Sequence, residues 1–294
     1  KNPILSYEFK PGYRSDDRDL PHDYRVINSH GMRDVERQYA KPPGTRRIIL
    51  LGDSVVVGYR IGKIDQLMSR QLEMLYRGRD VEVLNLAVTG YCTRAEVELL
   101  RVKGLRYDPD AVILVFVEND FRNYNPESIG ASGIEGRPAC VNWLFRRCHL
   151  FRLTCLRLNW FHFGLEADPA RWNDEAIGDN NVPEGLALLA KLADEHGFQP
   201  LVAVWPAFKD DGIVYPPKMF LPDREELIVE RLARAHGLPV VGLREAFREH
   251  WLRGTKPRPN PRKTYSIGDE MHASVEGHRV AAQILHRVIE ETGL

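Results

Sequence analysis

The chain has 294 residues, of which 43% are hydrophobic and 28% are charged, and this ordinary globular composition excludes wholesale disorder. Lys plus Arg and Asp plus Glu both number 41, so the formal net charge is zero. A nucleic-acid-binding protein usually carries a basic excess that neutralises phosphates. The composition therefore favours a small molecule or a neutral polymer as substrate, with no nucleic acid as partner.

Residues 1–45 are rich in Pro, Gly, Asp and Arg, and are predicted to form an N-terminal arm on a domain that spans residues 46–294. Short apolar runs in that domain are predicted to be strands. Most of them are continuous rather than alternating, which is typical of a parallel sheet covered on both faces. The runs are Arg47–Leu51, Val81–Leu86, Ala111–Val117, Pro200–Trp205 and Pro239–Leu243.

Helical patterns lie between and after these runs. Three glycines, Gly104, Gly197 and Gly237, stand where left-handed residues commonly end helices. Strands that alternate with helices imply right-handed crossovers, so we predict an α/β fold: a doubly wound, three-layer α/β/α sandwich around about five parallel strands. The helical patterns cover Lys63–Arg77, Arg94–Gly104, Pro183–Gly197, Asp223–Gly237, Arg244–Leu252 and Ser274–Glu291.

Residues 121–181 interrupt this alternation and are predicted to form a lid-like insertion with one amphipathic helix near Val141–Phe163. Two interpretations stay open. The helix packs its apolar face on the domain, or it serves as a lid or a membrane-surface element, with arginines on one side and aromatic side chains on the other. Either would cover the strand ends. We interpret His149 and His162, within this insertion, as structural. Gly136–Leu165 holds no acidic residue but contains Arg137, Arg146, Arg147, Arg152 and Arg157.

The four cysteines are too few for a disulfide scaffold, and they lack the spacing of a zinc site, so no metal is expected. Cys140 and Cys148 are either free thiols or a disulfide that would indicate an oxidising compartment. The chain begins at Lys1, and its longest apolar run is too short to span a bilayer. Two locations stay open: export or the periplasm, with a signal or anchor upstream, or the cytoplasm.

The segment Leu51-Gly52-Asp53-Ser54 ends the first predicted strand and precedes a helical pattern. Ligand sites of open α/β sheets gather at the carboxyl ends of strands, and a tight strand-to-helix turn exposes a serine. Such a turn also favours the negative charge that develops in acyl transfer. The alternative is that Asp53 and Ser54 only cap the helix. Nearby, Gly58–Lys63 has the wrong glycine spacing for a phosphate-binding loop, so no nucleotide cofactor is expected.

Three further segments supply partners for such a serine. Asn85–Gly90 and Val117–Asp120 follow the next two strands, and Asp269–His272 precedes the last helix. A hydrolytic serine needs a base, a group that orients the base, and donors aimed at the developing oxyanion. Each requirement has a candidate at a strand end or a helix entry.

In this order the segments resemble the signature blocks of SGNH hydrolases of the GDSL superfamily, which carry Ser, Gly, Asn and His. The resemblance implies the SGNH hydrolase fold with its flavodoxin-like parallel sheet. It also implies Ser54 as nucleophile, His272 as base, and Asp269 as the acid that orients the base. The oxyanion would be held by the backbone N–H groups of Ser54 and Gly90 and by the Asn119 side chain.

The resemblance covers residues 46–120 and 264–294, and Asn28–Arg33 resembles arms found on some bacterial members. One residue departs from the pattern: Val117 stands where the third block usually has glycine, which we expect to narrow the acyl pocket. Glu270 is an alternative to Asp269. We interpret His278 as a helix-face residue that packs or faces solvent.

The expected function is therefore serine-dependent hydrolysis of a carboxylic ester: O-deacylation of a small molecule, a glycan or a lipid-like substrate, without cofactor or metal. Two alternatives stay open, namely an acyltransferase with the same triad and an inactive scaffold used for binding. Contact with a membrane surface through residues 141–163 is a further expectation. The oligomeric state is left open.

Overall fold

The sheet sets the architecture. In the computed structural model, residues 4–5, 7–15, 26–121, 138–158, 160–162, 181–208, 220, 224–255 and 260–294 are described. All pairings within the sheet are parallel, in the order β2-β1-β3-β4-β5, which is the flavodoxin-like doubly wound order. Each strand begins and ends within one residue of its predicted run: β1 Arg46–Gly52, β2 Val81–Ala87, β3 Ala111–Phe116, β4 Gln199–Val204 and β5 Val240–Gly242.

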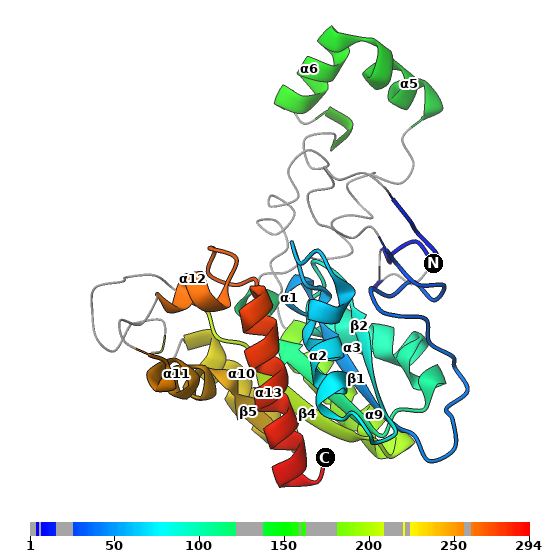
Figure 1. Cartoon of the computed structure of the whole chain (residues 1–294). Helices are drawn as coiled ribbons and strands as arrows, with labels where there is room; N and C mark the ends of the chain where they lie inside the picture. The colour runs from blue at the N-terminus through cyan, green and yellow to red at the C-terminus, as the bar shows by residue number, and fades with distance from the viewer. Residues whose placement is uncertain are drawn as a thin grey trace.

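Helices cover both faces of this sheet (Figure 1). Alternate strand residues enter two separate apolar clusters, so that Ile48 and Leu50 face one helical layer while Ile49 and Leu51 face the other. One layer holds α1 Ser54–Val57, α2 Met68–Leu75, α11 Leu243–Arg253, α12 Pro261–Tyr265 and α13 Val275–Thr292. The other holds α3 Thr93–Val102, α9 Asn181–His196 and α10 Arg224–Ala235. The predicted three-layer α/β/α sandwich is confirmed.

The central strand explains why its sequence run is continuous. All six side chains of β3 are fully buried, because both faces of the strand are covered, and each large one contributes about 1.5 to 3 kcal/mol by leaving water. The chain leaves β3 through the short 3-10 helix η3 Glu118–Phe121. The carboxyl ends of β1, β2 and β3 therefore meet at one edge, where the sequence placed its candidate residues.

Local features differ from the predictions in several places. Gly197 and Gly237 end helices with positive φ as expected, but Gly104 does not and instead begins η2 Gly104–Tyr107. A Cβ there would lie 2.7 Å from the side chains of Leu100 and Leu86, so close packing, not a left-handed turn, requires this glycine. The pattern at Lys63–Arg77 divides into η1 Ile64–Gln66 and α2.

Part of the N-terminal arm packs firmly on the domain. The Asn28 side chain accepts hydrogen bonds from the backbone N–H groups of His30 and Met32 at 3.0 and 2.9 Å, which closes a turn. That turn directs the buried Arg33 into the domain, where its guanidinium donates to the carbonyl oxygens of Val57 and Gly58 at 2.8 and 2.6 Å and to that of Ile61. Arg33 thus satisfies carbonyl groups at the end of the helical turn that begins with Ser54.

Within its described residues the insertion forms two helices rather than the single predicted one. α5 Ala139–Arg147 and α6 His149–Leu158 meet at Cys148 and are followed by η4 Trp160–His162, and in Figure 1 they stand apart from the sheet. We call residues 138–158 and 160–162 the α5–α6 hairpin. The four cysteines form no disulfide bond, so Cys140 and Cys148 are not bridged. Among the described helices, none combines the length and the apolar character needed to cross a bilayer.

Candidate active site

Ser54 lies on the tight turn that leaves β1. It is the first residue of α1, a single helical turn that Gly58 closes in the left-handed conformation, and it is 6% exposed. Asp53 caps this turn by accepting a hydrogen bond from the Val55 N–H at 2.9 Å. The turn requires glycine at position 52, because a Cβ there would lie 2.3 Å from a methyl group of Val56. This geometry holds the Ser54 hydroxyl at the edge of the sheet.

Two residues from the other end of the chain meet that hydroxyl. The Nε2 atom of His272 lies 2.9 Å from Ser54 Oγ, and its Nδ1 atom lies 2.7 Å from Asp269 Oδ2. With the Nδ1 proton directed at the carboxylate, Nε2 is left as an acceptor for the serine proton. The arrangement is therefore suited to general-base activation of Ser54.

Asp269 is held by the loop that it helps to close. Its Oδ1 atom accepts from the backbone N–H groups of Met271 and His272 at 3.0 and 2.8 Å. Burial by itself raises the pKa of Asp269, but the hydrogen bonds from the His272 ring and from these N–H groups outweigh it, and the net pKa lies below the usual value. The carboxylate is accordingly ionised in the neutral range, as an acid that orients an imidazole must be.

The Asn119 side chain lies beside the serine turn. Its Nδ2 atom donates to Asp53 Oδ2 at 2.9 Å, which ties the end of β3 to the turn after β1. An amide nitrogen carries two hydrogens, and one of them remains for another acceptor. Asp53 thus both caps α1 and fixes the Asn119 amide.

Gly90 lies on the turn after β2 with φ of 77°. Its backbone N–H has no acceptor within the described part of the chain. The neighbouring Val88 N–H donates to the Gly52 carbonyl at 3.1 Å, so this turn is joined to the residue two positions before Ser54. The N–H of Gly90 therefore belongs to the same edge of the sheet as Ser54.

Two further acids lie beneath these residues. Burial and the negative charge of Asp53 raise the pKa of Asp120 well above its usual value, although the Thr93 hydroxyl donates to this carboxyl group at 2.6 Å. Burial, and the negative charges of Asp120 and Asp53, likewise raise the pKa of Glu96. Both carboxyl groups therefore hold their protons to higher pH than exposed acids do, which limits the negative charge beside Asp53.

Several solved structures share this arrangement of strands and helices. An acetyl xylan esterase from Geobacillus stearothermophilus is 14% identical, with 85% of this chain and 97% of that chain covered and a TM-score of 0.50. A Bacillus subtilis protein is 13% identical, with 92% and 60% covered and a TM-score of 0.51. A two-domain esterase active on acetylated mannans is 13% identical, with 84% and 49% covered and a TM-score of 0.50.

The chain has the SGNH/GDSL hydrolase fold. This likeness concerns the fold, since the identities are low. No family model and no curated protein sequence matches the chain. The chemistry therefore has to be argued from its own residues.

The remaining sequence predictions have separate outcomes. Val117 is 1% exposed and belongs to the apolar core, and its narrowing of the acyl pocket stays a prediction. Glu270 lies near Arg262, with 3.8 Å between Oε1 and Nη1, while Asp269 faces the imidazole. His278 is fully buried, and its Nδ1 atom accepts from the Met68 N–H at 3.1 Å. It packs rather than facing solvent, and it caps the N-terminus of α2.

Three aromatic residues near the site were not predicted. The Tyr59 ring lies against the His272 ring with centroids 4.5 Å apart and the ring planes tilted by 38°. Trp205 Nε1 donates to the Met271 carbonyl at 2.8 Å and so supports the loop that carries His272. The Tyr7 hydroxyl donates to the Thr89 carbonyl. Each contact joins residues distant in sequence, and only the position of Tyr59 shortly after Ser54 offered a signal.

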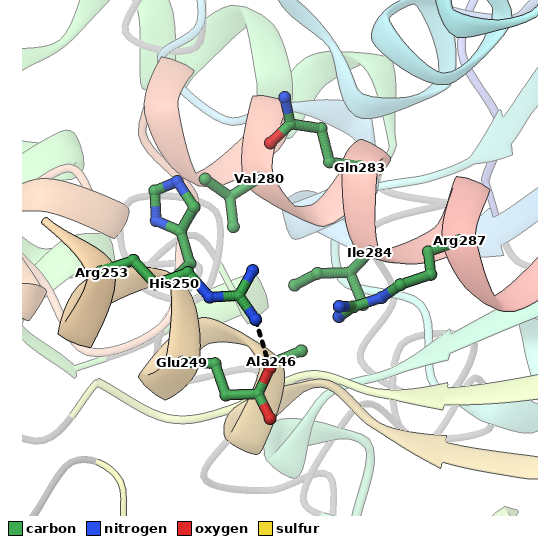
Figure 2. A pocket seen from close by; sticks show the side chains of 8 residues that line it. All are labelled: Ala246, Glu249, His250, Arg253, Val280, Gln283, Ile284 and Arg287. Atoms are coloured by element: carbon green, nitrogen blue, oxygen red, sulfur yellow. Dashed lines mark hydrogen bonds and ion pairs between the residues drawn. The ribbon is translucent and has the colours of Figure 1, made fainter.

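A cavity of about 150 Å³ lies between α11 and α13 (Figure 2). None of the residues in the serine arrangement lines it. In the described segments, no group of three or more His, Cys, Asp or Glu side chains is placed to hold a metal ion. The cavity is lined by Ala246, Glu249, His250, Arg253, Val280, Gln283, Ile284 and Arg287.

Proposed function

We propose that this protein hydrolyses a carboxylic ester through an acyl-enzyme intermediate on Ser54. The observation that carries the proposal is the continuous contact from Ser54 Oγ to His272 Nε2 at 2.9 Å and from His272 Nδ1 to Asp269 Oδ2 at 2.7 Å. A buried serine that only capped α1 would not need a base with an oriented proton. Asp53, moreover, already supplies the cap.

In the first half-reaction Ser54 Oγ attacks the ester carbonyl carbon while His272 Nε2 takes the serine proton. The tetrahedral intermediate then expels the alcohol, which receives this proton from His272, and the acyl group stays on Ser54. In the second half-reaction His272 takes a proton from water, whose oxygen attacks the acyl carbon. The acid is released, and the proton returns to Ser54. Asp269 remains ionised throughout and stabilises the imidazolium.

The negative oxygen of each intermediate would be held by the N–H groups of Ser54 and Gly90 and by the Asn119 amide. The support for this assignment is that the Gly90 N–H has no acceptor among the described residues and that Asp53 fixes Asn119 beside Ser54. Losing one such donor typically costs about 100- to 1000-fold in rate.

The substrate class that we propose is an O-acylated carbohydrate or a lipid-like ester. Two esterases with this fold act on acetylated xylan and acetylated mannans. The same acyl-enzyme would also pass its acyl group to an added alcohol if water were excluded. Product analysis with and without an acceptor alcohol separates hydrolysis from transfer.

The decisive test is turnover of p-nitrophenyl acetate by the parent, by Ser54→Ala and by Ser29→Ala, which removes a hydroxyl from the arm. Ser54→Ala should lose at least about 1000-fold in kcat and should no longer react with a fluorophosphonate probe. Ser29→Ala should match the parent in both assays. Covalent labelling of Ser54→Ala at the parent's rate would show that another residue is the nucleophile.

A further inference from the structure

The α5–α6 hairpin sets its own shape. The Arg152 guanidinium donates to the carbonyl oxygens of Phe145 and Arg146 at 3.0 and 2.9 Å, and it lies 5.7 Å from the centre of the Phe145 ring. These bonds satisfy carbonyl groups at the C-terminus of α5, which a helix leaves open. The rings of Phe151 and Phe161 lie 6.2 Å apart. Arg152 therefore fixes α5 against α6, and the two phenylalanine rings join α6 to η4.

The hairpin nevertheless exposes its large apolar side chains. The exposed fraction is 63% for Trp143, 73% for Leu150 and 57% for Leu153. Leu158, Trp160 and Phe161 are exposed as well. Elsewhere in the described residues the exposed large apolar side chains are aliphatic, and none exceeds 48%. A group of this kind is typical of a surface that binds a partner.

The charge of the hairpin indicates what that partner is. Residues 138–162 contain four arginines and neither Asp nor Glu, which gives a formal charge of +4 with His neutral, on a chain whose net charge is zero. A partner surface that matches both the charge and the exposed apolar side chains of the hairpin is negatively charged on the outside and apolar just beneath. The hairpin arginines are Arg146, Arg147, Arg152 and Arg157.

We propose that the α5–α6 hairpin binds the surface of an anionic phospholipid bilayer. Trp143, Leu150 and Leu153 would enter the boundary between headgroups and acyl chains, where tryptophan is favoured. Arg146 and Arg147 would meet lipid phosphates, while Arg152 keeps its bonds within the hairpin. Helices of 9 and 10 residues are too short to cross the hydrocarbon core, so the hairpin lies on the bilayer. The rest of the chain would then face a substrate at or near that surface.

The test is co-sedimentation of the whole chain with vesicles of phosphatidylcholine, with and without phosphatidylglycerol, at low and high ionic strength. The parent should bind the mixed vesicles, and high salt should weaken this binding. Trp143→Ala with Leu150→Ala, and separately Arg146→Gln with Arg147→Gln, should each weaken partition roughly tenfold or more. Leu227→Ala, which removes an exposed leucine from α10, is the matched control and should bind like the parent.

Ser54→Ala should also bind like the parent, so the outcome of the binding test is independent of the proposed esterase activity. Absence of binding to phosphatidylglycerol vesicles at low ionic strength would overturn the proposal. So would unchanged binding by both double variants. A dimer that forms without lipid and is lost with Trp143→Ala and Leu150→Ala would identify a second copy of the chain as the partner instead.

A second inference, from a different observation, concerns the beginning of the arm. The Tyr7 hydroxyl donates to the Thr89 carbonyl, and the Tyr91 hydroxyl donates to the Tyr7 carbonyl. The rings of Tyr7 and Tyr91 meet edge to face, with centroids 5.4 Å apart. The arm is thus attached on both sides of Gly90.

The Thr89 carbonyl and the Gly90 N–H belong to one peptide group. In a planar trans peptide these two bonds point in opposite directions, so holding the oxygen of Thr89 fixes where the N–H of Gly90 points. A Cβ on Gly90 would lie 2.7 Å from the Tyr7 hydroxyl oxygen, which shows how closely Tyr7 approaches. We infer that Tyr7 is a positioning residue that keeps the Gly90 N–H directed at the oxyanion. This inference rests on the proposed function.

Tyr7→Phe tests it, because the change removes only the hydroxyl. We expect kcat for p-nitrophenyl acetate to fall about tenfold with KM unchanged, since one donor is loosened rather than lost. The melting temperature should stay close to that of the parent. Tyr13→Phe, in the same arm, is the control and should leave both constants unchanged. A parent-like kcat in Tyr7→Phe would overturn this inference alone, whereas a parent without Ser54-dependent turnover would overturn the proposed function as well.

Discussion

The arm and the α5–α6 hairpin both lie outside the sandwich, yet they differ in which side chains they bury. The arm buries the charged side chains of Arg33, Asp34 and Arg37, whereas the hairpin exposes Trp143 and Leu150. Burial of a charge is tolerated only where hydrogen bonds replace water. The arm finds those bonds on the domain, and so it belongs to the folded core, whereas the apolar surface of the hairpin is left for a partner.

Arg37 shows how the arm provides these hydrogen bonds. Arg37 lies 3.0 Å from Asp34 and 2.7 Å from Glu73, and it also donates to the Val83 carbonyl at 3.0 Å. Burial raises the pKa of Asp34 and outweighs the opposing effect of Arg37. Burial also raises the pKa of Glu73. Arg37 and the hydrogen bond from the Val83 N–H lower it by more, so the net pKa lies below the usual value. The arm therefore bonds directly to α2 and β2.

The largest effect should come from Arg33→Met, which keeps an apolar chain but removes every donor. The carbonyl groups of Val57, Gly58 and Ile61 would be left buried without this partner, and we expect a loss of about 3 kcal/mol or more in the free energy of unfolding. Chemical denaturation measures it. The matched control is Arg14→Met: Arg14 also donates to backbone carbonyls, but it is exposed, so water can replace it and the loss should stay below about 1 kcal/mol. Equal losses of unfolding free energy in Arg33→Met and Arg14→Met would mean that burial of Arg33 does not increase its contribution to stability.

The next effect concerns His278, which lies close to Arg33. Burial, and the positive charge of Arg33, lower the pKa of His278 from 6.5 to about 3. The unfolded chain binds this proton below about pH 6.5 and the folded chain does not. The neutral, buried His278 therefore stabilises the folded protein above its unfolded pKa of 6.5. This contribution is lost as the pH falls from there through the folded pKa of about 3. From pH 7 to pH 5 the loss from this group is about 2 kcal/mol.

His278→Asn should remove that dependence while keeping an acceptor for the Met68 N–H. The measurement compares the change in unfolding free energy between pH 7 and pH 5 in the variant and the parent, so a constant cost of the substitution cancels. Other acids contribute equally to both proteins. If the two slopes coincide, His278 takes up a proton without unfolding, and its burial beside the arm is less complete than the structure indicates.

A smaller effect is expected from Gly90→Ala. Left-handed backbone at φ of 77° costs a residue with a side chain about 1 kcal/mol, and the added methyl group would also press on the Tyr7 hydroxyl. In a Tyr7→Phe background the second cost should largely vanish. A double-mutant cycle on unfolding free energy therefore tests whether the arm contacts Gly90. Strict additivity would show that Tyr7 does not lie against Gly90 in solution.

The sheet could be predicted well from the sequence because its strands are β-branched apolar runs, each bounded by polar segments. Such runs are recognised locally, without knowing which segments they contact in the fold. The positions of Ser54 and His272 followed from their blocks, and the structure places both within hydrogen-bond distance. The break at Cys148 was missed, since it depends on Arg152 reaching back to the carbonyl groups of α5. Tyr7 was missed for a similar reason: its contact with Thr89 spans 82 positions, and no local pattern indicates it.

The smallest effect should come from the hairpin, and it is the sharpest test of the comparison. Trp143→Ala, Leu150→Ala and Leu153→Ala together should change the unfolding free energy of the domain by less than about 0.5 kcal/mol, because these side chains stay in water in both states. Leu186→Ala is the contrasting variant: this leucine of α9 is fully buried, and its truncation should cost about 2 to 5 kcal/mol. Urea denaturation, followed by far-UV circular dichroism without lipid, gives both values. A loss of about 2 kcal/mol or more in the triple variant would mean that the hairpin packs its apolar side chains on the domain, as the arm packs its arginines. The bilayer would then have no apolar surface left to bind.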